Sequence, residues 1–271
     1  MLANRPGGKI ETHVPGFDLI TGGGLIRSSA ILLIGDSDGR KELLARQVSW
    51  NLLQEGAKVL YYTVDQSAED LRYDMASYGW DVKPFEDTGK FQLVDIFSDA
   101  AGKMTNTVAR ETEFDSSLVQ KGFYDLNVVY KEGIRFLPPT SPLHETKLAV
   151  FDSLSPLLSS KQEETIQLLH VLKFATRITK ATGIGIVQSG VHDKRIEDTL
   201  KSIADGIVNL TLIGGPLSTT SIIEIVKYSG EYRRGPFPVE LDEKGLRIVP
   251  IVLPNLAQVF GSARLDHAES N

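Results

Sequence analysis

The sequence predicts an α/β fold in which a mostly parallel β-sheet lies between layers of helices and ends in an antiparallel edge. Short, fully apolar runs such as AILLI (30–34) are typical of strands buried on both faces. These runs alternate with helical segments through most of the chain, and that alternation favours a parallel sheet covered on both sides. Three closely spaced runs near the C-terminus, 221–228, 236–241 and 246–252, are interpreted as an antiparallel set.

Strands and helices alternate regularly in the first third of the chain. The segment 41–54 has helical periodicity, with Glu42 and Arg46 at the i,i+4 spacing of an ion pair, and Gly56 ends it. Ser67 begins an S-x-x-D helix start. The expected elements are strands over 30–34, 58–64 and 91–96, and helices over 41–54 and about 68–79.

The middle of the chain, residues 98–146, is an irregular, insertion-like region. It mixes a helical pattern near 114–121 with a strand-like run, NVVY (127–130). A capping box of Ser160 and Glu163 precedes the next long helix. The other expected strands cover 147–151, 183–188, 206–212 and the three C-terminal runs. We expect one domain over residues 1–260 and a disordered polar tail over 261–271.

Charge and composition narrow the class of protein. The chain has 29 Lys and Arg against 35 Asp and Glu, a net charge of −6, which disfavours broad nucleic-acid binding but leaves a local basic patch open. It has no cysteine, which excludes disulfides and thiolate metal sites. No apolar stretch has the length of a membrane span, and the N-terminus lacks the apolar run of a secretory signal. We expect a cytoplasmic protein.

The segment GDSDGRKE stands between a strand and a helix, as a phosphate-binding loop does. A working loop reads G-x-x-x-x-G-K-[ST]: glycines let backbone N–H groups close around phosphate, the lysine meets the β- and γ-phosphates, and the hydroxyl holds Mg²⁺. Gly35 and Lys41 keep the first and seventh positions. Gly39 is in the fifth place, Arg40 replaces the second glycine and Glu42 replaces the hydroxyl residue. These five are the candidate cofactor-binding residues.

Two interpretations of this loop stay open. Its charged side chains sum to −1, counting Asp36, Asp38, Arg40, Lys41 and Glu42. The N-terminus of the following helix still favours an anion, but Glu42 can satisfy that preference itself. The loop is therefore either a nucleotide site or a retained turn and helix start without a ligand. In both cases, tight Mg·ATP binding is not expected.

Several segments together resemble one family. PGFDLITGGG, followed by a strand and the loop, resembles the opening of RecA-superfamily ATPases of the KaiC and archaeal RadA-paralogue group. VLYYTVDQSAEDLRYDMASYGWDV is similar to that family's second strand and helix, and LAVFDSLSPLL to its Walker B strand. IADGIVNLTL and IIEIVKYSGEYRRGPFPVEL resemble its last strands. The resemblance covers 14–252 and implies a RecA-like P-loop NTPase fold, with ATP and Mg²⁺ as cofactors.

The resemblance also implies roles for three residues outside the loop. Asp152 stands at the Walker B position and would hold Mg²⁺ through water; a helix cap after the strand is the alternative. Asp65 stands where relatives have an acid that orients the attacking water, although it is a methylene shorter and is followed by Gln66. Lys227 stands where relatives have a lysine that reaches the nucleotide of a neighbouring subunit, with Ser229 in the place of an arginine.

Departures at four catalytic positions, Arg40, Glu42, Gln66 and Ser229, indicate lost hydrolysis. We therefore expect a regulatory or scaffolding subunit that forms a homo-oligomer or assembles with an active relative. The alternative is an ATP-binding, weakly active ATPase, acting in DNA repair and recombination or in another archaeal KaiC-like process such as motility. The charge balance does not favour a nucleic-acid partner.

Overall fold

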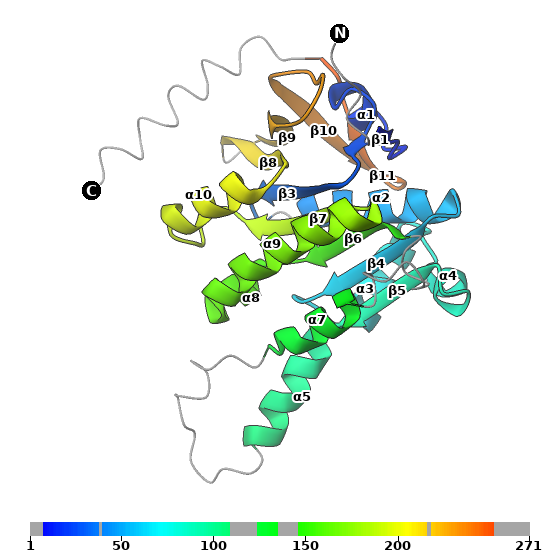
Figure 1. The fold of residues 1–271 in the computed structure, drawn as a ribbon. Helices are drawn as coiled ribbons and strands as arrows, with labels where there is room; N and C mark the ends of the chain where they lie inside the picture. The colour runs from blue at the N-terminus through cyan, green and yellow to red at the C-terminus, as the bar shows by residue number, and fades with distance from the viewer. Residues whose placement is uncertain (1–7, 38–39, 109–123, 135–145, 216–217, 252–271) are drawn as a thin grey trace.

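A nine-stranded sheet forms the centre of the molecule in a computed structural model, which describes residues 8–37, 40–108, 124–134, 146–215 and 218–251 (Figure 1). Its strand order is β11-β10-β9-β8-β3-β7-β6-β4-β5. In this order, the strands from β8 through β5 pair in parallel with one another. At the other edge, β9, β10 and β11 form antiparallel pairs. The expected mostly parallel sheet with an antiparallel C-terminal edge is confirmed.

The strands are β1 Lys9–Ile10, β2 Leu25–Ile26, β3 Ser29–Gly35, β4 Lys58–Thr63, β5 Phe91–Asp95, β6 Thr146–Asp152, β7 Thr182–Gln188, β8 Gly206–Gly215, β9 Ser218–Lys227, β10 Pro236–Asp242 and β11 Gly245–Ile248. The helices are α1 Phe17–Ile20, α2 Arg40–Gln54, α3 Ala68–Ser77, α4 Lys83–Asp87, α5 Ile96–Val108, α7 Leu126–Ile134, α8 Ser155–Ser160, α9 Gln162–Thr179 and α10 Lys194–Ile203. None of the helices in this described part is long and apolar enough to cross a membrane.

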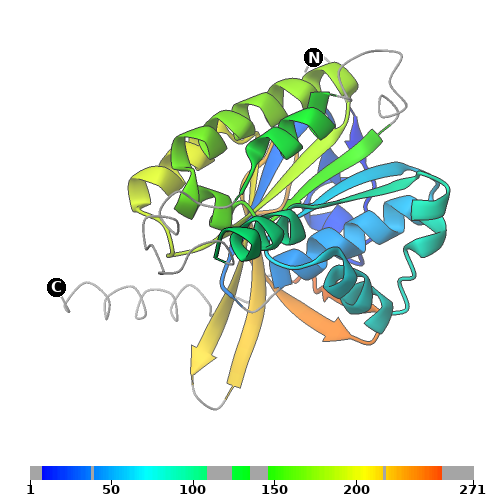
Figure 2. The ribbon, with the colours of Figure 1, turned by 90° about the horizontal axis from the view of Figure 1, so that it is seen from below.

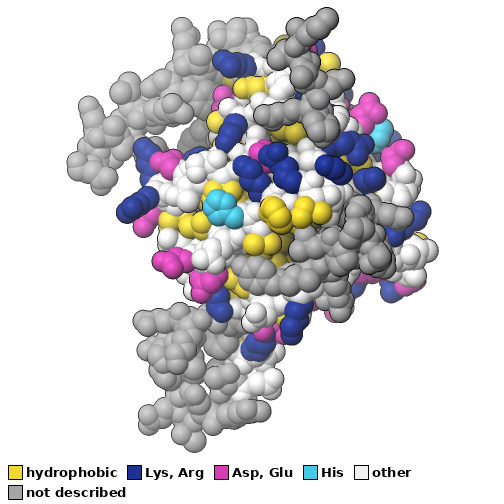
Figure 3. Space-filling model, viewed as in Figure 1, with side chains coloured by type: hydrophobic (Ala, Val, Ile, Leu, Met, Phe, Trp, Pro, Cys, Tyr) yellow, Lys and Arg dark blue, Asp and Glu magenta, His cyan; other side chains and the backbone are white. Residues whose placement is uncertain are grey.

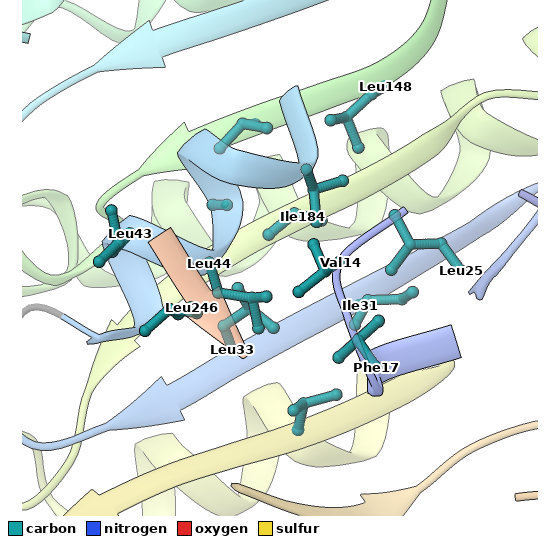
Figure 4. Packing of buried hydrophobic residues seen from close by; sticks show 14 of the residues in the cluster. Val14, Phe17, Leu25, Ile31, Leu33, Leu43, Leu44, Leu148, Ile184 and Leu246 are labelled. Atoms are coloured by element: carbon teal, nitrogen blue, oxygen red, sulfur yellow. The ribbon is translucent and has the colours of Figure 1, made fainter. Parts of the chain in front are cut away.

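Two hydrophobic cores cover the two faces of the sheet. Alternate residues of β3 divide between them: Ile31 and Leu33 face one core, and Leu32 and Ile34 face the other. Figure 4 shows the first core, where α2 and β11 pack on the sheet. Helices α8, α9 and α10 supply the second core. Figure 2 shows the two helical layers and the hairpin of β8 and β9 extending beyond them.

Some local predictions hold and others do not. The cap at Ser67 is confirmed, because its hydroxyl accepts a hydrogen bond from Asp70 N at 3.1 Å. The strand-like run 127–130 is instead part of helix α7, where helical spacing buries Leu126 and Val129 in the second core. The capping box of Ser160 is wrong, because this hydroxyl donates to Pro156 O at 2.9 Å and so ends α8. Residues 114–121 and 261–271 lie outside the described residues.

The N-terminal GFD and GGG residues attach the first elements to the sheet. Asp18 accepts hydrogen bonds from Thr12 Oγ1 at 2.7 Å and from His13 N at 2.9 Å, which folds the chain around α1. Ile248 N donates to Pro15 O at 2.8 Å and ties this turn to β11. Gly16 has a φ of +79°, and a Cβ there would lie 2.0 Å from Ile248 O. This motif therefore has a structural role.

Replacing Gly16 by Ala tests that role. Gly79→Ala is the matched control, since Gly79 has a φ of +76° but open space where a Cβ would lie. We expect Gly79→Ala to lower the free energy of unfolding by about 1–2 kcal/mol, the cost of a left-handed alanine. Gly16→Ala should cost about 1–3 kcal/mol more, because the methyl group displaces β11. Urea unfolding of both variants measures the difference, and equal losses would contradict the close contact.

Candidate functional site

The carboxyl ends of four parallel strands meet at one edge of the sheet and bring the candidate residues together. Gly35 at the end of β3 is in register with Gln188 at the end of β7, and Asp152 at the end of β6 is in register with Thr63 at the end of β4. Asp65 lies two residues after the end of β4. The sequence predicts this meeting of strand ends correctly. Gly39 and Asp38 of the loop lie outside the described residues.

Gly35 is required by the sheet itself. A Cβ at this position would lie 2.0 Å from Leu210 O on the neighbouring strand β8. The next residue, Asp36, accepts a hydrogen bond from Leu212 N at 2.8 Å, so its carboxylate points to β8. The start of the loop is thereby tied to β8, which explains Gly35 without a ligand.

Lys41 is buried and its ammonium group is fully used within the chain. Its Nζ donates to Asp36 O at 2.7 Å and to Gln188 Oε1 at 3.0 Å, and it forms an ion pair with Glu42 Oε1 at 2.7 Å. Only 1% of the residue is exposed. A lysine ammonium has three protons to donate, and three acceptors surround this one.

Glu42 stands at the third position of α2, where a first-turn acid is favoured by the helix dipole. One of its carboxylate oxygens pairs with Lys41, while the other, Oε2, is buried without a hydrogen-bond partner among the residues that the structure describes. Burial raises the pKa of Glu42, the nearby charge of Asp152 raises it further, and the hydrogen bond from Lys41 opposes both effects. The expected pair of Glu42 with Arg46 is not formed, since Lys41 takes this carboxylate and Arg46 bonds elsewhere.

Arg46 and Tyr61 enclose the carboxylate of Asp152. Asp152 is 2% exposed, and its Oδ2 accepts hydrogen bonds from Tyr61 Oη at 2.6 Å and from Arg46 Nη2 at 3.2 Å. The other guanidinium nitrogen, Nη1, bonds Asp74 Oδ2 at 3.0 Å on α3. Burial raises the pKa of Tyr61 and the charge of Asp152 adds to this, so the phenol remains a hydrogen donor at neutral pH. Asp152 is therefore neutralised by its own chain and does not cap the following helix.

Neither Tyr61 nor Arg46 is predicted from the sequence as a partner of Asp152. Tyr61 lies on the inward face of β4, together with Val59, and a buried tyrosine hydroxyl requires a hydrogen-bond partner. This requirement is the feature of the sequence that indicates a buried partner for Tyr61. For Arg46, the i,i+4 spacing to Glu42 pointed to a local pair instead of a distant one.

Asp65 contacts the residue after Asp152. Ser153 Oγ donates to Asp65 Oδ2 at 2.6 Å, which connects the ends of β4 and β6. Burial raises the pKa of Asp65, and the charge of Asp152 raises it as well, while the bond from Ser153 lowers it. The carboxylate that resembles a water-orienting acid thus already serves as a hydrogen-bond acceptor within the chain.

Lys227 is not brought to this edge. It lies at the end of β9 opposite Ile207, near the start of β8. Its Nζ donates to Ala204 O at 2.6 Å and to Lys201 O at 3.2 Å, so it binds the last carbonyls of α10. A cation at a helix C-terminus is favourable, and this contact explains Lys227 within one chain.

Comparison with models of known protein families identifies the family of this chain. The model of a family described as "ATPase: KaiC" matches residues 10–252. The chain belongs to the KaiC ATPase family. Sequence relatives include UPF0273 proteins of Pyrococcus horikoshii, 29% identical over 246 residues (89% of this chain, 94% of the relative), and Thermotoga maritima, 27% identical over 249 residues (89% and 96%).

Two further KaiC-type proteins extend the comparison. Circadian clock protein KaiC3 of Synechocystis is 24% identical over 267 residues, which cover 95% of this chain and 48% of that protein. The crystal structure of a KaiC-like protein from Pyrococcus horikoshii superposes with a TM-score of 0.67 at 22% identity, covering 90% of this chain and all of that one. At this identity, the superposition supports the KaiC-like fold and nothing finer.

The cofactors of a KaiC-type ATPase, ATP and Mg²⁺, do not fit the residues as they stand. Lys41 already has its anionic partner, and Asp152 already has its cation. In the part of the chain that the structure describes, no three His, Cys, Asp or Glu side chains are grouped to hold a metal ion. The chain keeps the fold of the family, and its charged residues at the phosphate loop and at the end of β6 bind one another.

Replacing Tyr61 by Phe tests the contact with Asp152. We expect a loss of about 1.5–3 kcal/mol in the free energy of unfolding, because the acceptor is charged and buried. Tyr228→Phe is the matched control: this buried phenol donates to a neutral carbonyl, Gly24 O, at 2.8 Å, and its loss should cost about 1 kcal/mol. Urea unfolding measures both, and a smaller loss for Tyr61→Phe would contradict the contact.

Replacing Glu42 by Gln tests its raised pKa. The folded chain holds this proton more tightly than the unfolded chain, so the contribution of Glu42 to stability is complete below the unfolded pKa and is lost as pH rises through the folded pKa. The free energy of unfolding of Glu42→Gln minus that of the wild type should therefore increase from about pH 4 upward and then level off.

Urea unfolding over a pH series measures this difference. Glu163→Gln, on the exposed first turn of α9, controls for the substitution itself. A difference between Glu42→Gln and the wild type that stays constant with pH would contradict the effect of burial on Glu42.

Proposed function

We propose that this KaiC-family protein does not hydrolyse ATP and acts as a regulatory or scaffolding subunit, in a homo-oligomer or together with an active relative. The observation that carries the proposal is the complete internal use of Lys41. In a working phosphate loop this ammonium group meets the β- and γ-phosphates. Here it is buried and faces three acceptors of its own chain.

A nucleotide has to compete with these acceptors. Each hydrogen bond that involves a charged group contributes about 1.5–3 kcal/mol, and Lys41 would have to exchange three such contacts for phosphate. Glu42 places a carboxylate beside the position of the phosphates, where a second anion is disfavoured. The exchange favours the internal arrangement, which supports weak or absent nucleotide binding.

The residues that would activate the attacking water and contact a neighbouring subunit's nucleotide are also incomplete. Gln66 is neutral, and Asp65 is held by Ser153. A base has to be within hydrogen-bond reach of the water that it activates, and a misplacement of about 1 Å can cost roughly 100-fold in rate. Lys227 is occupied by the end of α10, so it does not supply the contact expected across a subunit interface. These observations support the loss of hydrolysis.

One observation favours a weakly active ATPase as the second candidate. Lys41, Asp65 and Asp152 still lie at one edge of the sheet, as an active site would require. A role in DNA repair is less supported, because acidic side chains are interspersed with basic ones on the face of α9 and α10 in Figure 3.

Titration with ATP, with and without Mg²⁺, tests the proposal. We expect calorimetry to show no binding, or binding without turnover, and a phosphate-release rate equal to that of buffer. Lys41→Ala should not change that rate, since Lys41 takes no part in hydrolysis. Lys83→Ala, a variant of an exposed residue on α4, is the control.

Hydrolysis at the rate of an active KaiC-family relative, lost in Lys41→Ala and kept in Lys83→Ala, would overturn the proposal. Slower hydrolysis with the same dependence on Lys41 would also overturn the proposal and would establish the second candidate.

A further inference from the structure

We propose that Arg46 takes the place of a divalent cation at Asp152, so that this end of the sheet is complete without a metal ion. It goes beyond the proposed function, because it concerns the binding of a divalent cation at Asp152 and does not involve a nucleotide. It rests on the arrangement of Arg46, Tyr61, Asp74 and Asp152.

The guanidinium bridges two carboxylates, as a metal ion would. Arg46 Nη2 is 3.2 Å from Asp152 Oδ2 and Nη1 is 3.0 Å from Asp74 Oδ2. The two acids come from β6 and α3, elements that are far apart in the sequence. A single cation on α2 therefore connects them, and the planar guanidinium suits such pairs better than a lysine would.

The position of Arg46 leaves no electrostatic need for a second cation. Asp152 Oδ2 already accepts two hydrogen bonds, one from the guanidinium and one from Tyr61, which is completely buried. A metal ion on the same carboxylate would lie within a few ångströms of the guanidinium, where like charges repel strongly in a poorly solvated site.

The carboxylates that could bind Mg²⁺ at this edge already have partners within the chain. Mg²⁺ requires octahedral coordination by oxygen. Glu42 Oε1 pairs with Lys41, and its other oxygen, Oε2, is buried without a hydrogen-bond partner among the described residues. Arg46, already attached to the chain, is the cation that the described residues provide.

Binding of Mn²⁺ in the absence of nucleotide tests the inference. We expect calorimetry and electron paramagnetic resonance to show the same Mn²⁺ binding for the wild type and for Asp152→Asn, so that no bound Mn²⁺ depends on Asp152. The thermal midpoint of the wild type should be the same in chelator and in excess Mg²⁺. Arg46→Ser should unfold at a lower temperature and regain part of that loss with Mn²⁺, and the double variant Arg46→Ser, Asp152→Asn should not.

Arg72→Ser is the matched control, because Arg72 forms a bidentate pair with Glu86 away from the site, at 2.9 and 2.8 Å. Its midpoint should not respond to Mn²⁺. If Arg46→Ser does not fold, the comparison of wild type with Asp152→Asn still decides the matter. Mn²⁺ binding by the wild type that Asp152→Asn abolishes would overturn the inference, as would a folded Arg46→Ser without Mn²⁺ binding. Neither outcome bears on ATP hydrolysis.

Discussion

The pairing of buried charges at the carboxyl edge of the sheet is the interaction on which the rest of this site depends. Lys41 and Arg46 both lie on α2: Lys41 pairs with Glu42 of the same helix, and Arg46 pairs with Asp152 at the end of β6. Buried ions are costly, and the cost is offset only where each has partners of good geometry. Removing a single partner leaves an uncompensated charge, which is why the pairs behave as one unit.

These pairs also organise the surrounding elements. Lys41 connects α2 to the end of β7 through Gln188, and Arg46 connects it to β6 and α3. Ser153 joins the ends of β6 and β4. In a KaiC-type ATPase, a bound nucleotide would connect the same strand ends. In this chain, side chains connect these strand ends.

The sequence predicts most of the fold, because its buried strands are continuous apolar runs and their order determines which ends meet. It points to an ion pair of Glu42 with Arg46, whereas Lys41 pairs with Glu42 in the structure. It fails for residues 127–130, whose β-branched valines favour a strand until packing against the second core makes them helical. The contact of Arg46 with Asp152 spans 106 residues, and no local pattern records it.

The same separation has a consequence for how the chain changes over evolutionary time. A substitution at Arg46 alone leaves Asp152 buried beside Tyr61 without its cation, and a substitution at Asp152 alone leaves the guanidinium without its buried acceptor. Either step passes through a less stable chain, so we expect the two positions to change together. A metal ion at this edge would have to replace the guanidinium of Arg46 while Asp152 stays as its ligand, so the charge of Asp152 would be compensated throughout only if the metal arrived as Arg46 was lost.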